Sequence, residues 1–312
     1  MILPQILPQT GGWGGMGATL RSHANHPKCG HARWLSKANH MPPSLNRSIA
    51  DSIDAPVEAL RWIDEVFADL AALGSSPRLI ARWLADAGIG TRHAVLDLGC
   101  GKGAVAVEVA ARLACRVVGV DAFKPFVQSA ATLAAARNVS HLCQFQKADA
   151  RRYPIAARHG PTPRFDAVLM VGLFDLEDAA AVLRPLVRPG GLYLIDDCVS
   201  PGRSPPTDDA PLTRSEARLL LEERGDRIER ETMWTPSQVL RVESVLADQI
   251  ARRVRAIIRR EPAARVPLTE FLKRQRASAS DLVGAVRPAM WLVRKRGSGS
   301  GRPANATRKR AV

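Results

Sequence analysis

The nine residues VLDLGCGKG (residues 95–103) decide the fold of this chain. Apolar residues and an acid lead into Gly99, Gly101 and Gly103, and an apolar helical pattern follows directly. A strand that ends in such a loop lets a ligand approach bare backbone, because glycine lacks the Cβ atom that would block it. Asp97 indicates the kind of ligand, since a carboxylate there would repel a pyrophosphate but suit a cation or an ammonium group.

The segments around this loop alternate between strand and helix patterns. Apolar runs typical of buried strands occupy residues 93–98, 116–120, 143–147, 166–171 and 192–196, and helical patterns lie between them at 104–113, 124–137 and 176–187. Further on, capping boxes open helices at Thr213 and Thr235, and strands are expected at 226–233 and 289–293. Alternating strands and helices, with strands that are almost wholly apolar, predict an α/β fold with a parallel sheet covered on both faces.

Helical additions and tails are expected around this core. The first helix after Thr235 is expected to turn Val239, Val242, Leu246, Ile250, Val254 and Ile257 inward. The predicted units are a disordered tail (1–45), an N-terminal helical cap (46–90), a cofactor-binding core (91–200), the rest of the core (201–296) with a helical lid (235–288), and a disordered basic tail (297–312).

A second acid follows the glycine loop, at a sequence spacing that indicates its role. Asp121 ends the second predicted strand, 22 residues after Gly99. An acid at this spacing is placed to accept hydrogen bonds from both ribose hydroxyls of a bound nucleoside. The loop and the acid together predict a nucleoside-containing cofactor. Asp97 disfavours a dinucleotide such as NAD and suits the methionine ammonium or sulfonium of S-adenosylmethionine.

With these residues the chain resembles the class I S-adenosylmethionine-dependent methyltransferases. The resemblance covers about residues 80–294 and is strongest over residues 95–197. It implies a Rossmann-like, doubly wound, seven-stranded and mostly parallel sheet whose last strand is antiparallel. It also implies S-adenosylmethionine as the cofactor, methyl transfer as the reaction and no metal.

The resemblance further implies which residues hold the cofactor. The glycine loop would surround its methionine part, Asp121 would bind the ribose with Ala122 and Phe123 beside the adenine, and Asp149 of KADA (147–150) would lie near the adenine amino group. The segment FDAVLMVGLFD (165–175) would face the transferred methyl. The expected cofactor-binding residues are Asp97, Gly99, Cys100, Gly101, Gly103, Asp121, Ala122, Phe123, Asp149, Ala150 and Met170.

Methyl transfer is an in-line displacement, so the protein must mainly align the nucleophile with the methyl group and exclude water. A general base is needed only if the nucleophile arrives protonated. Asp175 and Asp196 are the candidates, because both follow strand ends at the expected ligand edge. Each has an ordinary alternative: Asp175 would cap the helix that starts near Leu176, and Asp196 or its neighbour Asp197 would satisfy local backbone.

The charge pattern bears on the substrate. The chain has a net charge of +15, and residues 251–312 hold 17 of its 45 basic residues but only three of its 30 acidic ones. An RNA or protein methyltransferase that docks its substrate on these helices is left open. It is not favoured over a small-molecule acceptor, because no aromatic residues interleave with the arginines as a stacking platform requires. A non-catalytic cofactor-binding protein and a homodimer through the lid also remain open.

No run of about 18 uncharged apolar residues occurs, so no transmembrane helix and no membrane partner are expected. The first residues, MILPQILPQ, lack the basic start of a secretory signal. The sequence therefore predicts a cytoplasmic protein.

Overall fold

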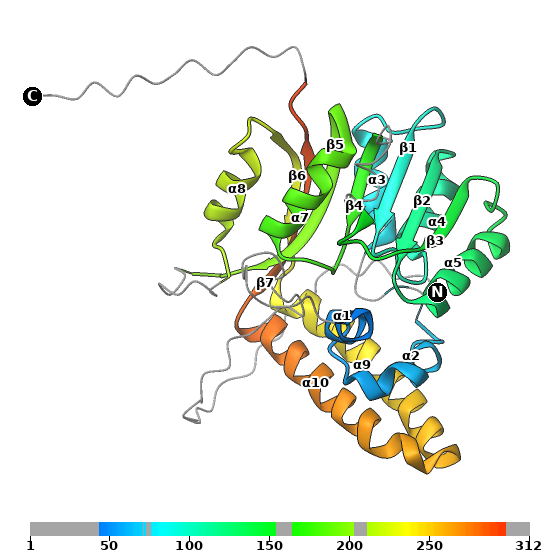
Figure 1. Cartoon of the computed structure of the whole chain (residues 1–312). Coiled ribbons are helices and arrows are strands. Elements are labelled where there is room, and N and C mark those ends of the chain that lie inside the picture. Colours follow the sequence, from blue (N-terminus) through cyan, green and yellow to red (C-terminus); the bar gives the residue numbers. More distant parts are fainter. Residues whose placement is uncertain (1–43, 71, 73–75, 154–163, 203–210, 298–312) are drawn as a thin grey trace, which may run out of the picture.

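A seven-stranded sheet forms the centre of the computed structural model, which describes residues 44–70, 72, 76–153, 164–202 and 211–297 (Figure 1). Its strands are β1 (Ala94–Leu98), β2 (Arg116–Asp121), β3 (Cys143–Lys147), β4 (Phe165–Met170), β5 (Val187–Val199), β6 (Arg227–Met233) and β7 (Arg287–Arg294). They lie in the order β3-β2-β1-β4-β5-β7-β6, and β7 runs antiparallel to both β5 and β6. The predicted α/β class and the antiparallel last strand are thus confirmed.

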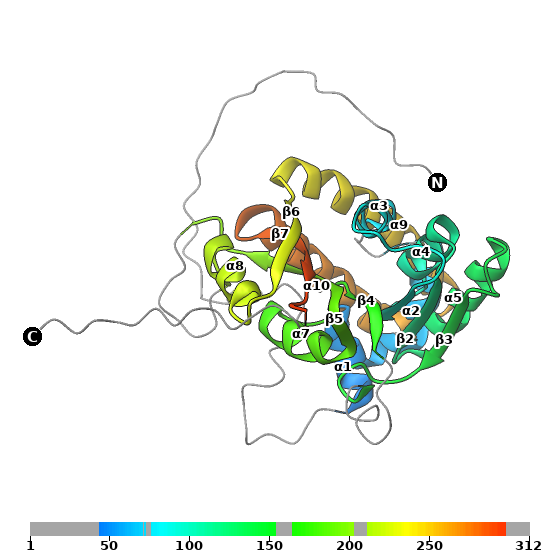
Figure 2. The ribbon, with the colours of Figure 1, turned by 90° about the horizontal axis from the view of Figure 1, so that it is seen from above.

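Helices cover both faces of the sheet (Figure 2). Neighbouring residues of β1 show why: Val95 joins a core with the helices of one face, and Leu96 joins a core with those of the other, as alternation along a strand requires. The first face carries α3 (Pro77–Asp86), α4 (Ala104–Leu113) and α5 (Lys124–Ala136), and the second carries α7 (Leu176–Leu183) and α8 (Arg214–Glu222).

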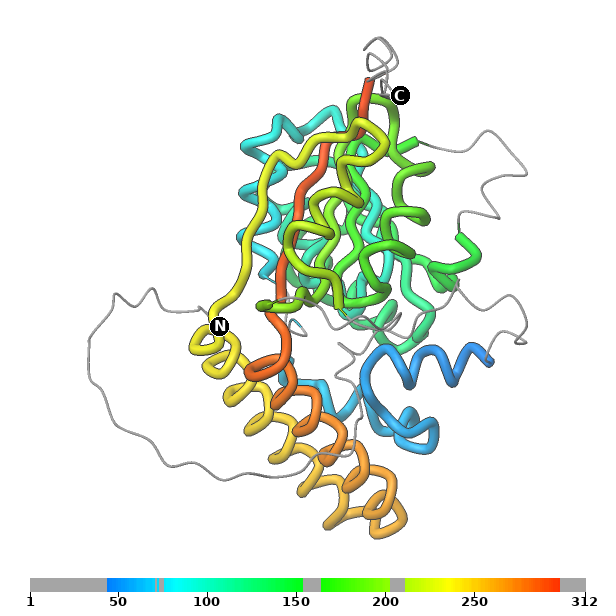
Figure 3. Tube along the Cα trace, turned by 90° about the vertical axis from the view of Figure 1, so that its left-hand side faces the viewer, coloured from blue at the N-terminus to red at the C-terminus, as the bar shows by residue number. Residues whose placement is uncertain are grey.

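A group of helices, which we call the helical cap, lies beyond one end of the sheet (Figures 1 and 3). It consists of α1 (Leu45–Ser52), η1 (Val57–Ala59), α2 (Leu60–Val66), α9 (Pro236–Arg260), η4 (Pro262–Ala264) and α10 (Arg265–Gly284). All of these segments except α1 share one core, in which Phe67 packs against Phe126 of α5 and Phe271 of α10. The helices α9 and α10 form a hairpin inserted between β6 and β7.

Two element predictions need correction. The helix expected over 176–187 ends at Leu183, because Pro185 has no N–H to continue the α-helical hydrogen bonds; η3 (Arg184–Leu186) follows, and β5 begins earlier than predicted. The helix α3 packs on α4. On α9, Val242 is 37% exposed, and Glu243 lies on the partly buried side in its place.

The predicted tails lie outside the described residues except at 44, 45 and 297, and α1 already begins at Leu45 with Ser44 as its N-cap. None of the described helices is both long enough and apolar enough to cross a membrane.

Candidate functional site

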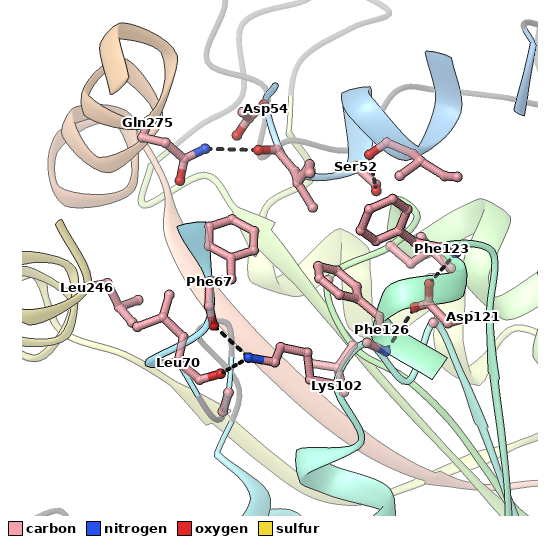
Figure 4. Close-up of a pocket in the computed structure, with 18 of the residues that line it drawn as sticks. Ser52, Asp54, Phe67, Leu70, Lys102, Asp121, Phe123, Phe126, Leu246 and Gln275 are labelled. Atoms are coloured by element: carbon pink, nitrogen blue, oxygen red, sulfur yellow. Dashed lines mark hydrogen bonds between the residues drawn. The ribbon is translucent and has the colours of Figure 1, made fainter. Parts of the chain in front are cut away.

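A cavity of about 710 Å³ lies between the sheet and the helical cap (Figure 4). From the sheet side it is lined by the segments that follow β1, β2, β3 and β4, where the carboxyl ends of parallel strands meet. From the cap side it is lined by α1, α9 and α10. Its volume lies within the range of about 300–1,000 Å³ that is usual for ligand sites.

The glycine loop after β1 forms part of the floor of this cavity. Gly99 has φ +75°, and a Cβ atom on it would lie 2.9 Å from Cδ2 of Leu173. Gly103 has φ +81°, and a Cβ atom there would lie 2.7 Å from Cβ of Ala130 on α5. Gly99, Cys100 and Gly101 line the cavity, whereas Gly103 does not. The glycine at position 103 lets α4 begin close against α5, and the cofactor contact predicted there stays a prediction.

Asp97 lies beneath the loop, with a side chain that is almost fully buried yet lines the cavity. Its Oδ2 atom has no hydrogen-bond partner within the described part of the chain. Burial raises the pKa of this carboxyl to about 7, and the neighbouring charge of Asp121 adds to the effect, while the backbone of Ala106 opposes it. A buried acceptor without a partner is costly, so this oxygen indicates a ligand that brings a donor or a positive charge.

Asp121 connects two of the loops that line the cavity. Its Oδ2 accepts from the backbone N–H of Gly101 at 2.9 Å, and its Oδ1 accepts from the N–H of Phe123 at 2.8 Å. Burial raises its pKa, although these backbone hydrogen bonds oppose the rise. Ala122 and Phe123 line the cavity beside it, so the structure brings these three predicted residues together with Asp97.

Asp149 and Ala150 also line the cavity, but the Asp149 carboxylate is already engaged. Arg151 donates through Nε to Oδ1 at 2.8 Å and through Nη2 to Oδ2 at 2.5 Å. Burial acts to raise the pKa of Asp149, but the hydrogen bonds and the charge of Arg151 leave it below its usual value. Arg151 also donates to Ser48 Oγ of α1 at 2.6 Å, so this pair joins the sheet to the cap.

Three other predicted site residues, Met170, Asp175 and Asp196, do not line the cavity. Met170 is buried in the core beneath α7. Asp175 is the N-cap of α7 and accepts from the N–H of Asp178 at 2.9 Å, and Asp196 Oδ1 accepts from the N–H of Gly172 at 2.7 Å. Both carboxylates hold the backbone of the segment between β4 and α7, whose N–H groups need acceptors.

The motif spacing did not predict the contacts between the glycine loop and the cap. Lys102 of the glycine loop donates through Nζ to the carbonyl oxygens of Phe67 at 2.6 Å and Leu70 at 3.1 Å (Figure 4). Burial lowers the pKa of this lysine. Aromatic rings stand next to it, with Phe123 and Phe126 in an edge-to-face contact at 4.9 Å. No local sequence signal could have told which side of each cap helix faces the sheet.

The chain is similar to known methyltransferases. Residues 95–191 match a family model described as a methyltransferase domain. A solved S-adenosylmethionine-dependent methyltransferase from Geobacter sulfurreducens, in complex with S-adenosyl-L-homocysteine, is 18% identical with a TM-score of 0.59, over 76% of this chain and 98% of that one.

Two other solved structures extend the comparison. Coclaurine N-methyltransferase, bound to N-methylheliamine and S-adenosylhomocysteine, is 15% identical with a TM-score of 0.58, over 77% of this chain and 79% of that one. The [4+2]-cyclase SpnF is 21% identical with a TM-score of 0.56, over 71% of this chain and 81% of that one. At these identities the likeness to solved structures is a likeness of fold.

Proposed function

We propose that this protein is a class I, S-adenosylmethionine-dependent methyltransferase and that it methylates a small molecule bound beneath its helical cap. The match of residues 95–191 to a methyltransferase-domain model supports this reaction. The observation that carries the proposal is the cavity itself. It joins the buried carboxylates at the strand ends to an apolar space covered by α1, α9 and α10. One continuous cavity can therefore hold a cofactor and its acceptor together.

The residues on the sheet side fit the cofactor. Asp97 Oδ2 lacks a partner and suits the ammonium of the methionine part, and the Asp121 carboxylate has acceptor capacity left for ribose hydroxyls. Phe123 offers an aromatic face to the adenine. Arg151 holds both oxygens of Asp149, so that carboxylate is the least available of the proposed contacts.

When bound, S-adenosylmethionine supplies a methyl carbon that a lone pair of the acceptor attacks, while the carbon–sulfur bond breaks and its electron pair stays on sulfur. The chain's own part is to bind, align and keep water out. Phe67, Leu70, Leu246 and Ile250 give the cap side of the cavity an apolar lining that favours this exclusion. Neither Asp175 nor Asp196 lines this cavity, which supports a transfer that uses neither of them as a base.

The choice of a small molecule over a polymer is supported by the cover that the cap gives the cavity. Arginines of α9 are in part tied up by acids of α2 and the residues after it, as in the pairs Arg253–Asp69 and Arg260–Glu65. A nucleic acid or a protein would have to place its reacting group underneath these helices.

The test is transfer of a radiolabelled methyl group from S-adenosylmethionine. The full chain is incubated with a metabolite extract, with total RNA and with mixed protein, and Asp121→Ala serves as the control. We expect label in the small-molecule fraction, dependent on Asp121. Label in RNA or protein instead would contradict the small-molecule acceptor. Cofactor binding without transfer of the methyl group to any fraction would contradict the proposal that the protein is an enzyme.

A further inference from the structure

Glu243 occupies an unusual place on α9. The inner side of this helix is otherwise apolar, and Val239, Ile250 and Val254 are buried along it. Glu243 lies one turn after Val239 and one turn before Leu246 and Ala247, so it shares their side of the helix. Like Leu246 and Ile250 it lines the cavity. An acid thus stands where the helical pattern calls for an apolar residue.

The carboxylate of Glu243 has no partner within the described residues. No hydrogen bond or ion pair reaches it there, and its side chain is partly withdrawn from water. Burial raises the pKa of this carboxyl. Removing a carboxylate from water without a partner costs free energy, so a bare acid at this position is a poor choice for stability. A positively charged ligand would offset this cost and would explain why an acid stands at position 243.

Apart from Asp97 and Asp121 on the sheet side, the other charged groups of the cavity are engaged or lie toward solvent. Lys102 donates to cap carbonyls, and Asp51 pairs with Arg47 at 3.0 Å. Arg151 is held by Asp149, and Asp54 accepts from Ser278. The remaining charged residues of the lining, Asp248, Arg255 and Arg276, are exposed.

Much of the lining of the cavity is apolar, although Gln275 and Ser278 of α10 are polar. On the α9–α10 hairpin it includes Leu246, Ile250, Leu272 and Leu282, and the loop after β4 adds Phe174. Such walls favour a hydrocarbon body, and the unpaired carboxylate of Glu243 on the cap side favours a positive charge close to it. An anionic ligand would be repelled, and an uncharged one would leave the carboxylate without a counter-charge.

We infer that the acceptor is a mainly apolar molecule carrying a cationic amine, and that Glu243 binds this amine. The inference rests on the proposed function and names the substrate class of the same cavity. Glu243 is a specificity-determining residue here: it contacts the substrate, whereas cofactor binding belongs to the sheet side of the cavity. Loss of the Glu243 charge should weaken binding of the acceptor and leave binding of the cofactor unchanged.

The experiment titrates three matched probes into the full chain saturated with S-adenosylhomocysteine. The probes n-hexylamine, n-hexanol and n-hexanoate share a hydrocarbon body and differ in charge. Calorimetry is expected to show the amine binding more tightly than the alcohol and the carboxylate. Glu243→Gln should lower the affinity for the amine about tenfold, as expected for a lost charge-assisted hydrogen bond, and leave the affinity for hexanol unchanged.

Controls separate this inference from the proposed function. Glu270→Gln makes the same charge change on α10, at a residue that pairs with Arg274 outside the cavity, and should leave all three probes unchanged. Glu243→Gln should bind S-adenosylhomocysteine as the unmodified chain does, which also shows that it is folded. Equal affinity for amine and alcohol, or an amine affinity that Glu243→Gln leaves intact, would overturn the inference alone. Failure of the unmodified chain to bind S-adenosylhomocysteine would overturn the proposed function.

Discussion

Asp97 and Glu243 face one cavity from opposite sides, and each lacks a protein partner for at least one oxygen within the described residues. The two carboxylates differ in depth: Asp97 lies under the glycine loop with its pKa raised to about 7, whereas Glu243 is only partly buried. Two unpaired acids at separate places suit two positive groups, one on the cofactor and one on the acceptor.

The protonation of Asp97 should govern cofactor affinity. In the free protein this carboxyl has a pKa of about 7, and a ligand ammonium favours the ionised form. Lowering the pH from 8 to 6 removes most of that form, so the affinity for S-adenosylhomocysteine should fall about tenfold. Titration calorimetry across this range measures it, and Asp97→Asn should bind weakly with little pH dependence. An affinity of the unmodified chain that stays constant from pH 8 to 6 would refute this role.

The same raised pKa affects stability with a definite sign. Because the folded state binds the Asp97 proton more tightly than the unfolded state, this group favours folding at low pH, and that contribution is lost as the pH rises through about 7. Asp97→Asn should therefore increase the free energy of unfolding at pH 8 more than at pH 5. Urea titrations at the two pH values compare these differences, and an equal effect at both would count against the raised pKa.

At the scale of elements, Asp175 is a candidate base by its position in the sequence, but in the structure it caps the N-terminus of α7. Asp175 accepts from the N–H of Asp178 at the N-terminus of α7. Asp175→Ala should lower the free energy of unfolding by about 1 kcal/mol, the usual loss for an N-cap. The rate of methyl transfer should be unchanged at a temperature where both proteins are folded. A large fall in kcat with unchanged stability would restore Asp175 as a base.

Lys102 connects the glycine loop to the end of α2. Its ammonium donates to the carbonyl oxygen of Leu70 and to that of Phe67, which also accepts from the backbone N–H of Leu70. Lys102→Met keeps most of the apolar stem and removes the donors. We expect faster hydrogen exchange in residues 67–72 and an unfolding free energy lower by about 1–3 kcal/mol.

Lys273→Met is the matched control, because Lys273 lies on the exposed side of α10. It should leave both the exchange rates and the stability nearly unchanged. If the two variants behave alike, Lys102 does not hold the cap to the loop.

The elements that the sequence predicts well are those with local signals. The strands β1 and β2 and the turns after them follow from apolar runs, positive-φ glycines and acids at strand ends. The side of α9 that faces the cavity depends on packing against α10 and the sheet. The apolar pattern alone therefore predicted Val242 on that side, whereas in the structure Glu243 lines the cavity and Val242 is exposed. Asp175 and Asp196 accept from backbone N–H groups and do not line the cavity, since nearby N–H groups compete for any acid at a strand end.

At the scale of the whole molecule, the cap is built from segments far apart in the sequence. The helices α1 and α2 precede the sheet, and α9 and α10 interrupt it between its sixth and seventh strands (Figures 1 and 3). Arg61 pairs with Glu261 at 2.5 Å, and Arg260 pairs with Glu65 at 2.7 Å, across this junction. Part of the basic charge of α9 thus serves assembly of the cap, although each exposed pair contributes only about 0–1 kcal/mol.

The whole arrangement serves one cavity, and cofactor binding there is its central test. S-adenosylhomocysteine is titrated by calorimetry into the unmodified chain and into Asp121→Ala, each shown to be folded by circular dichroism. We predict one binding site per chain and an affinity at least about 100-fold weaker in the variant, because two charge-assisted hydrogen bonds to the ribose are lost. No binding to the folded unmodified chain, or equal affinity in the two proteins, would contradict the proposed site.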